Sequence, residues 1–451
     1  MNLELRTGVT FGCWKFFFTG VAALLLAGCA SQRALMPTPS LYTGAEAKPL
    51  FVEVPTERRT PSIDLLYVTN RAPVADQQGK LSYGSQRSKS VAFGSAKVEL
   101  GPGLTWDEIE DASQHAERRT PVRLYLADME ELGRYPETPY LSLYTESGFV
   151  HDPIDMASHR EAENTLASEV SRRLNESSKR EVVLYVHGFK TTFEEAAFTI
   201  AELCHFLGRE HLCTMFTWPA GSRGSLLYSY GRDRESGEAS VAHVKQVIRS
   251  ISGVPGVEKV HLIAHSRGAD VLLRALRELM IETYVYGASP RDTLKIENLV
   301  LIAADIDVEV MLQYMTLYGS DPDMLSNWRK DELPLHLRGR MTIYASGSDL
   351  ALMASTLLFR SQSRLGRVRS SDFTDHMKDF LRESDKVDII QTPRDQSDLT
   401  GHSYFTRHPT VSSDLMALIR YGLRPGDAGR PLRPVKPPFI WAIESDQEDQ
   451  R

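Results

Sequence analysis

Short apolar runs and longer stretches with apolar residues at every third or fourth position alternate along most of this 451-residue chain. The short runs predict buried strands, and the longer stretches predict helices with one apolar face. We expect helices over residues 156–174 and 193–206, and another that begins near residue 269. We expect strands over residues 63–68, 96–100, 122–126, 140–144, 181–189, 214–217, 260–263, 299–304, 341–345 and 387–390.

This alternation of strand and helix indicates the fold class. Strands separated by helical stretches are typical of an α/β fold, a mostly parallel sheet with helices on both faces. We therefore expect one α/β domain over residues 62–424. Outside this domain, the alternation of predicted strands and helices is not evident. Residues 29–61 contain five prolines and predict a flexible tether, and residues 425–451 predict an extended tail that is rich in proline and then acidic.

The candidate chemistry begins at Ser266, between the predicted strand at 260–263 and the helix that begins near 269. A turn this sharp strains its central residue and exposes that side chain above the sheet, so small residues must flank it. Ala264 and Gly268 are small enough for this role. The stretch therefore predicts a nucleophile elbow with Ser266 as the nucleophile. The alternative is a chance match of small residues around a serine.

A serine hydroxyl attacks a carbonyl carbon when a base takes its proton and an acid orients that base. In the α/β-hydrolase fold, the acid and then the histidine follow the serine on later strand ends. Asp349 follows the predicted strand at 341–345, and His402 follows the one at 387–390. We predict that Ser266, Asp349 and His402 form a catalytic triad.

Other residues compete for two of these roles. Asp305 and Asp307 follow the predicted strand at 299–304, a position that some hydrolases use for the acid. His408 lies six residues after His402, in a stretch with the pattern of a surface turn. We favour Asp349 and His402 because each stands just beyond a strand end, where ligands bind in open α/β sheets.

The oxyanion that forms during ester cleavage needs backbone N–H groups that point into the site. We expect one from Arg267, directly after the nucleophile, where the helix dipole also stabilises negative charge. We expect the other from Phe189, at the tip of the strand that begins at residue 181. His187 is expected to have a structural role and to hold this loop by a hydrogen bond.

The first 28 residues differ from the rest of the chain. Two basic residues precede an apolar run over 16–26 that is short for a membrane span, and Leu-Ala-Gly-Cys ends at Cys29. This pattern resembles the signal peptide and lipobox of bacterial lipoproteins. The resemblance implies that residues 1–28 are removed, that Cys29 is lipidated, and that the protein is anchored in the cell envelope, at the outer membrane and facing the periplasm. An ordinary signal peptide, or a membrane anchor with an incidental cysteine, is the alternative.

Composition and motifs narrow the classes of partner. The net charge of −7 gives no indication of nucleic acid as a partner. The sequence contains no H-E-x-x-H, P-loop or dinucleotide-binding glycine motif, so we expect no cofactor and no metal. Cys204, His205, His211 and Cys213 lie within ten residues and form a weak candidate for a zinc site.

We instead predict a disulfide between Cys204 and Cys213. With Cys29 committed to lipid, these are the two remaining cysteines after the leader is removed. The body of a lipoprotein lies outside the cytoplasm, where thiol pairs become oxidised. Gly208 lies between them and allows the chain to turn back. Two buried cysteines that never meet are the alternative.

Several motifs in the chain resemble those of a bacterial α/β-hydrolase family of uncharacterised esterase/lipase-like proteins, and the resemblance covers residues 63–420. It implies a serine hydrolase fold with Ser266, Asp349 and His402 as the triad, and it leaves the substrate open. The motifs are 67–71 (Tyr-Val-Thr-Asn-Arg), 186–193 (Val-His-Gly-Phe-Lys-Thr-Thr-Phe), 217–219 (Thr-Trp-Pro), 264–268 (Ala-His-Ser-Arg-Gly), 303–307 (Ala-Ala-Asp-Ile-Asp), 344–349 (Tyr-Ala-Ser-Gly-Ser-Asp) and 401–405 (Gly-His-Ser-Tyr-Phe).

Two function hypotheses of different class follow. In the first, the protein is a cell-envelope serine hydrolase that cleaves small-molecule or lipid carboxylic esters through an acyl-enzyme. In the second, it is a lipid-tethered binding or scaffold protein that keeps a hydrolase fold. A complete set of serine, acid, histidine and oxyanion loop favours the enzyme. Residues 308–338 form either a lid or ordinary helical packing.

Overall fold

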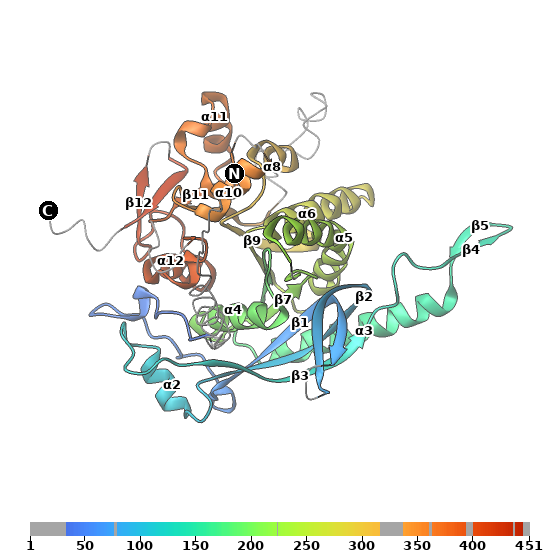
Figure 1. The fold of residues 1–451 in the computed structure, drawn as a ribbon, viewed down its shortest axis with the longest axis horizontal. Helices are drawn as coiled ribbons and strands as arrows, with labels where there is room; N and C mark the ends of the chain where they lie inside the picture. Colours follow the sequence, from blue (N-terminus) through green and yellow to red (C-terminus); the bar gives the residue numbers. More distant parts are fainter. Residues whose placement is uncertain are drawn as a thin grey trace, which may run out of the picture.

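The computed structural model describes residues 33–75, 79–222, 224–315, 337–359, 363–393, 400–435 and 438–444. Within these residues, one sheet of eleven strands runs through the centre of the molecule, and two more strands form a separate hairpin (Figure 1). The sheet has the spatial order β12-β13-β11-β10-β9-β8-β6-β7-β1-β2-β3. Its centre is the predicted parallel sheet.

The parallel strands occupy the middle of this order, and antiparallel strands are its outermost members on both sides. The parallel strands are β1 (Ser62–Ala75), β6 (Glu181–Val186), β7 (Leu212–Thr217), β8 (Lys259–His265), β9 (Ile296–Ile302), β10 (Arg340–Ala345), β11 (Val387–Gln391) and β13 (Ile440–Ile443). The antiparallel strands are β2 (Leu81–Leu100) and β3 (Leu124–Arg134) beyond β1, and β12 (Leu432–Val435) beyond β13.

Helices cover both faces of the sheet, as predicted. Successive side chains of a strand point to opposite faces. In β6, Val182 and Leu184 join one apolar core, whereas Val183 and Tyr185 join the other. The first core includes side chains of α3 (Pro153–Asn175), α5 (Leu226–Gly253) and α6 (Gly268–Val285), and the second includes side chains of α4 (Phe193–Phe206) and α12 (Pro409–Tyr421).

Local sequence signals set where these helices begin. Thr192 precedes α4, and its hydroxyl accepts from the Glu195 N–H while the Glu195 carboxylate accepts from the Thr192 N–H. This capping box satisfies backbone donors that lack a partner within the helix. The shorter helices are α2 (Trp106–Ala112), α7 (Pro290–Leu294), α8 (Val308–Met315), α10 (Leu350–Phe359) and α11 (Asp375–Ser384).

The predicted tether is wrong for its described part, residues 33–61. Leu35, Tyr42, Leu50 and Phe51 are buried in the core on the α4 side of the sheet. The Tyr42 hydroxyl donates to the Phe206 carbonyl oxygen over 2.6 Å. The segment has no periodicity because it runs irregularly over the surface, and each apolar side chain fills its own place in the core. Its prolines therefore do not make it a free linker.

The boundary at residue 424 is also wrong. Residues 432–435 and 440–443 form β12 and β13, and β13 pairs in parallel with β11. Ile440 is fully buried, so this end of the chain completes the sheet. In contrast, the strand predicted at 140–144 does not join the main sheet. It contributes to β4 (Ser142–Thr145), which pairs only with β5 (Gly148–His151) in a hairpin that projects near the start of α3 (Figure 1).

None of the helices in the described ranges combines the length and the apolar character needed to cross a bilayer. Residues 1–28 and Cys29 lie outside the described residues, as does the 316–336 part of the lid alternative. The described start of that segment, α8, places Met311 in the core.

Candidate active site

Ser266 lies in the turn between β8 and α6, as the sequence predicts. Its φ of +53° is in the left-handed region, which is strained for a residue with a side chain. Two backbone hydrogen bonds hold this conformation: the Ser266 N–H donates to the Ile302 carbonyl oxygen (2.9 Å), and the Asp305 N–H donates to the Ser266 carbonyl oxygen (3.1 Å). The turn therefore has the backbone geometry of a nucleophile elbow.

The small residues around the serine are required by close packing. A Cβ atom on Gly268 would lie 2.3 Å from the His187 carbonyl oxygen and 2.6 Å from that of Val186. A Cβ atom on Gly188 would lie 2.7 Å from the Cβ of Ser266. The loop that follows β6, which carries Phe189, is therefore in direct contact with the candidate nucleophile.

Asp349 and His402 come together although 53 residues separate them. The His402 Nδ1 lies 2.7 Å from Asp349 Oδ2. The Asp349 side chain is completely buried, and its other oxygen accepts from the Leu352 N–H (2.9 Å) at the start of α10. A buried carboxylate on Nδ1 fixes the ring orientation and leaves Nε2 as the nitrogen that can take a proton.

This pair lies against the elbow. His265 directly precedes Ser266, and its ring centroid lies 4.8 Å from that of His402. The His265 Nε2 is also 3.1 Å from the His402 carbonyl oxygen. The structure thus joins two members of the predicted triad by a hydrogen bond, and it places the third next to a residue that contacts His402.

The competing acids have other partners. The Asp305 carboxylate accepts from the Tyr230 hydroxyl (2.6 Å) and the Ser355 hydroxyl (2.7 Å), and it pairs with Arg364 (3.3 Å). The Asp307 carboxylate accepts from the Glu309 N–H in the first turn of α8. These contacts explain why Asp349, rather than either alternative, binds His402.

The competing histidine, His408, lies at the N-cap of α12. Its backbone N–H donates to the Tyr404 carbonyl oxygen over 2.8 Å. In the structure His402, and not His408, makes the hydrogen bond with Asp349.

The two expected oxyanion donors belong to Arg267, which follows Ser266 in the chain, and to Phe189, which follows Gly188 in the loop that contacts Ser266. Arg267 is the N-cap residue of α6, so its N–H has no acceptor within the helix. Its guanidinium pairs with Asp270 (2.9 Å) and donates to the Asp305 carbonyl oxygen (3.4 Å). The Phe189 ring packs on that of Tyr230, with centroids 5.1 Å apart.

The polar network that holds the Phe189 loop was not predicted from the sequence. Arg71, from β1, is almost completely buried. It donates to Thr191 O (2.7 Å), Ala220 O (2.8 Å) and Thr217 Oγ1 (2.7 Å). Burial lowers the pKa of Arg71 to about 9, so the side chain stays cationic at neutral pH. A charged residue at the end of an apolar run was the available signal.

Asp233, in α5, fixes the same loop from the other side. Its carboxylate accepts from the Lys190 N–H (3.1 Å), the Gly221 N–H (3.1 Å) and the Ser222 hydroxyl (2.7 Å). Lys190 adopts a φ of +59°, and this contact stabilises that strained residue directly after Phe189. Nothing in the sequence distinguishes Asp233 from the other polar residues of its helix.

His187 has the structural role expected for it. Its Nδ1 is 2.9 Å from the Gly188 carbonyl oxygen, and its Nε2 accepts from the Trp218 N–H (3.1 Å). Burial, together with the charge of Arg71, holds the pKa of His187 well below its usual value. The imidazole is therefore neutral and serves to position the loop.

Cys204 and Cys213 form the predicted disulfide, with Cα atoms 6.1 Å apart. Both sulfurs are thus in a covalent bond, which removes them from the weak zinc set that the sequence suggested. His205 of that set hydrogen-bonds with the Ser113 hydroxyl over 2.7 Å.

A family model described as "Alpha/beta hydrolase of unknown function (DUF900)" matches residues 162–420, which is more than half of the 451 residues. The chain belongs to this α/β-hydrolase family. The match includes Ser266, Asp349 and His402, and it leaves β1, β2 and β3 outside. The expected resemblance to an α/β-hydrolase family is confirmed for residues 162–420. No curated protein matches the chain.

Two esterases are among the solved structures similar to this α/β hydrolase. One is esterase B from Lactobacillus rhamnosis, in a structure with a tributyrin phosphonate: 11% identity, a TM-score of 0.29, and coverage of 60% of this chain and 95% of that chain. The other is the Pyrobaculum calidifontis esterase: 11% identity, a TM-score of 0.30, and coverage of 59% and 94%. The fold assignment rests on the sheet and on the family match.

Proposed function

We propose that this α/β hydrolase is a serine esterase that cleaves carboxylic esters through an acyl-enzyme. The observation that carries the proposal is the hydrogen bond of His402 with the buried Asp349 carboxylate, beside a strained elbow with Ser266 at its centre. The three residue types stand in the chain order and at the strand ends that such hydrolases use.

Each residue then has a defined part in the reaction. The Ser266 Oγ attacks the ester carbonyl carbon while His402 Nε2 takes its proton. The tetrahedral intermediate collapses, its bond to the alcohol oxygen breaks, and His402 returns the proton to that oxygen. A water molecule, activated by the same nitrogen, hydrolyses the acyl-Ser266 bond and releases the acid. Asp349 holds the Nδ1 side of the imidazole throughout.

The developing oxyanion is stabilised by the backbone N–H groups of Arg267 and Phe189. In acyl-transfer enzymes, one such donor accelerates the reaction by about 10²–10³-fold when it is held in place beforehand. The first turn of α6 orients one donor, and the Arg71 and Asp233 contacts hold the loop that carries the other. The proposal thus gives a function to a buried network that the fold alone does not require.

We extend the proposal to the location of the enzyme. The predicted leader ends just before Cys29, and the packed body begins within a few residues of that cysteine, because Arg33 pairs with the buried Glu202 (2.5 Å). Four residues span at most about 14 Å. A lipid on Cys29 would therefore hold the hydrolase close to the membrane surface. Cys29→Ser should abolish labelling by a radioactive fatty acid, and equal labelling of the variant would contradict lipidation.

A panel of p-nitrophenyl esters of increasing acyl length tests the activity and defines the acyl preference. The wild-type protein should hydrolyse at least one member, and Ser266→Ala should lower kcat by about 10³-fold or more. A wild-type protein that hydrolyses no ester, or an alanine variant with full activity, would contradict the proposal. The first outcome would favour a binding or scaffold role.

A further inference from the structure

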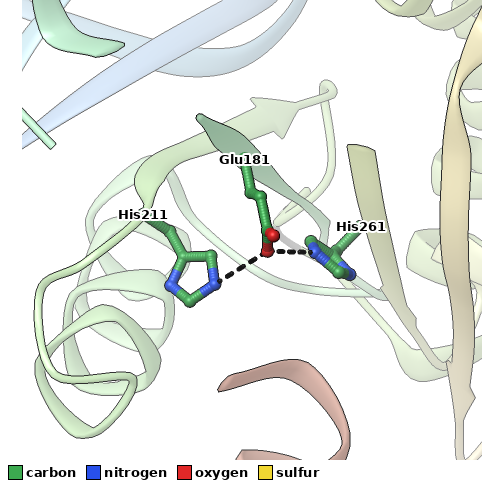
Figure 2. Close-up of side chains that lie close together, drawn as sticks. All are labelled: Glu181, His211 and His261. Atoms are coloured by element: carbon green, nitrogen blue, oxygen red, sulfur yellow. Dashed lines mark hydrogen bonds and ion pairs between the residues drawn. The ribbon is translucent and has the colours of Figure 1, made fainter. Parts of the chain in front are cut away.

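A second cluster of ionisable side chains lies at the opposite edge of the sheet, where the parallel strands begin. Glu181 is the first residue of β6, His211 directly precedes β7, and His261 is near the start of β8. Because β6 lies between β7 and β8, the two imidazoles approach the one carboxylate from both sides (Figure 2).

The spacing of the three groups is that of metal ligands. The Glu181 Oε2 lies 3.5 Å from His211 Nε2 and 3.0 Å from His261 Nε2, and one ligand atom from each residue falls within 4.8 Å of the others. A tetrahedral cation with bonds of about 2.0–2.1 Å separates its ligand atoms by about 3.3 Å. A small inward adjustment of His211 would therefore place a cation between all three.

His211 gives an independent indication of a missing ligand. Its side chain has no exposed surface. Within the described residues its Nδ1 has no hydrogen-bond partner, and its Nε2 makes only a long contact of 3.5 Å with the Glu181 carboxylate. Buried polar groups are almost always satisfied, because burying one without a partner is costly. Figure 2 shows that a ring nitrogen of His211 faces the Glu181 carboxylate. A cation bound there would satisfy the nitrogen.

The donor set suits a cation. Two imidazoles and one carboxylate are ligands that Zn²⁺ and similar cations prefer.

Neighbouring side chains orient the candidate ligands, and a cavity gives access to them. The Asn298 side-chain amide lies 2.9 Å from His261 Nδ1. Rotating that amide by 180° presents its oxygen to an Nδ1–H, which is the usual way a ligating histidine is oriented. Lys259 pairs with the other oxygen of Glu181 (3.2 Å) and leaves Oε2 to the histidines. A cavity of about 350 Å³ reaches Glu181 and His261, with room for a water molecule as fourth ligand.

We propose that Glu181, His211 and His261 bind a transition-metal cation of the Zn²⁺ class, which links the starts of three neighbouring strands at the edge away from the active site. The site uses none of the residues proposed for ester cleavage. The cation is structural: it links β6, β7 and β8 and stabilises the folded chain by binding it.

Titration of the EDTA-treated full chain with Co²⁺, followed by visible absorption, tests the proposal. We expect one saturable equivalent with the spectrum of a nitrogen- and oxygen-bound ion, displaced by Zn²⁺, and a higher melting temperature with metal. His211→Gln and His261→Gln should each weaken binding more than about 100-fold, and Asn298→Ala should weaken it about tenfold. The matched control is His115→Gln, at an exposed histidine, which should bind as the wild type does.

The absence of a saturable Co²⁺ spectrum in the wild type would overturn the site and show that the cluster is a hydrogen-bonded network of two histidines around a glutamate. Unchanged affinity in His211→Gln and His261→Gln, with native near-ultraviolet circular dichroism, would overturn it as well. If both variants fail to fold, Asn298→Ala decides in the same way. Ser266→Ala should bind Co²⁺ normally, which separates this test from that of the esterase.

Discussion

The two edges of the central sheet carry the same kinds of side chain in different settings. At the carboxyl edge, one histidine meets one aspartate: His402 and Asp349, 2.7 Å apart. At the amino edge, two histidines flank one glutamate, Glu181. Strand β8 reaches both, because His261 is near its start and His265 ends it, about 13 Å further along at the rise of an extended strand.

The difference lies in the backbone that carries these groups. At the carboxyl edge, they stand in loops beyond the strand ends, next to a strained serine and the N-terminus of α6. Free backbone donors and a helix dipole there stabilise charge that develops during a reaction. At the amino edge, the ligand candidates belong to the strands or directly precede one, and both histidines are buried. The first setting suits proton transfer, and the second suits a bound ion.

The largest expected effect comes from removing the acid at the carboxyl edge. Asp349→Asn should lower kcat for ester hydrolysis by about 10³-fold or more, because the histidine loses the charge and tautomer that the carboxylate imposes. Co²⁺ binding at the amino edge should not change. Steady-state kinetics with the best ester of the panel measure the effect.

Asp305→Asn is the matched control, since Asp305 is equally buried and follows the neighbouring strand. Its carboxylate contacts Tyr230, Ser355 and Arg364, so the variant should lose stability, by about 1–3 kcal/mol, more than activity. A larger loss of kcat in Asp305→Asn than in Asp349→Asn would assign the acid to the earlier strand.

The carboxyl edge was predictable from the sequence, and the amino edge was not. Ser266, Asp349 and His402 each follow a strand signal in the order of a known fold, so position alone identified them. Glu181, His211 and His261 occur at strand starts, where polar residues are common, and their meeting depends on β6 lying between β7 and β8. The apolar pattern within each strand does not reveal the order of the strands in the sheet.

The ends of the domain show a second limit of the sequence. Residues 33–61 and 432–443 have no regular apolar period, yet Phe51 and Ile440 are buried. Their apolar side chains fill positions that the rest of the fold creates, so composition alone predicted a tether and a tail. Arg71 was visible as a charge beside an apolar run, but its partners come from the neighbouring strand β2 and from two loops far along the chain.

Adding a Cβ atom at the elbow, by Gly268→Ala, should have the next largest effect and should lower the stability of the fold. Gly268→Ala places that atom against two carbonyl oxygens of the chain that ends β6, and overpacking of this kind should cost about 3 kcal/mol. Chemical denaturation measures the free energy of unfolding. Gly253→Ala, at a helical glycine with open space, is the control and should be neutral or stabilising. Equal effects of the two changes would show that the elbow is not closely packed.

A smaller effect is expected from the disulfide at the amino edge. Cys204 and Cys213 close the short loop that carries His211, so the double change to alanine should cost about 2 kcal/mol of stability. It should also weaken Co²⁺ binding severalfold, because the loop must be ordered when the metal binds. Ester hydrolysis at low temperature should stay within about twofold of the wild type. A large loss of activity with unchanged metal affinity would reverse the comparison of the two edges.

Covalent labelling with a fluorophosphonate, followed by peptide mass spectrometry, shows directly whether Ser266 is an activated nucleophile. The reagent reacts with a serine that a neighbouring base has activated. We expect one phosphonylated residue, Ser266, in the native wild-type protein, much slower labelling in His402→Ala, and none in Ser266→Ala. No adduct on the folded wild-type protein, or an adduct on another serine that persists in Ser266→Ala, would contradict the proposed mechanism.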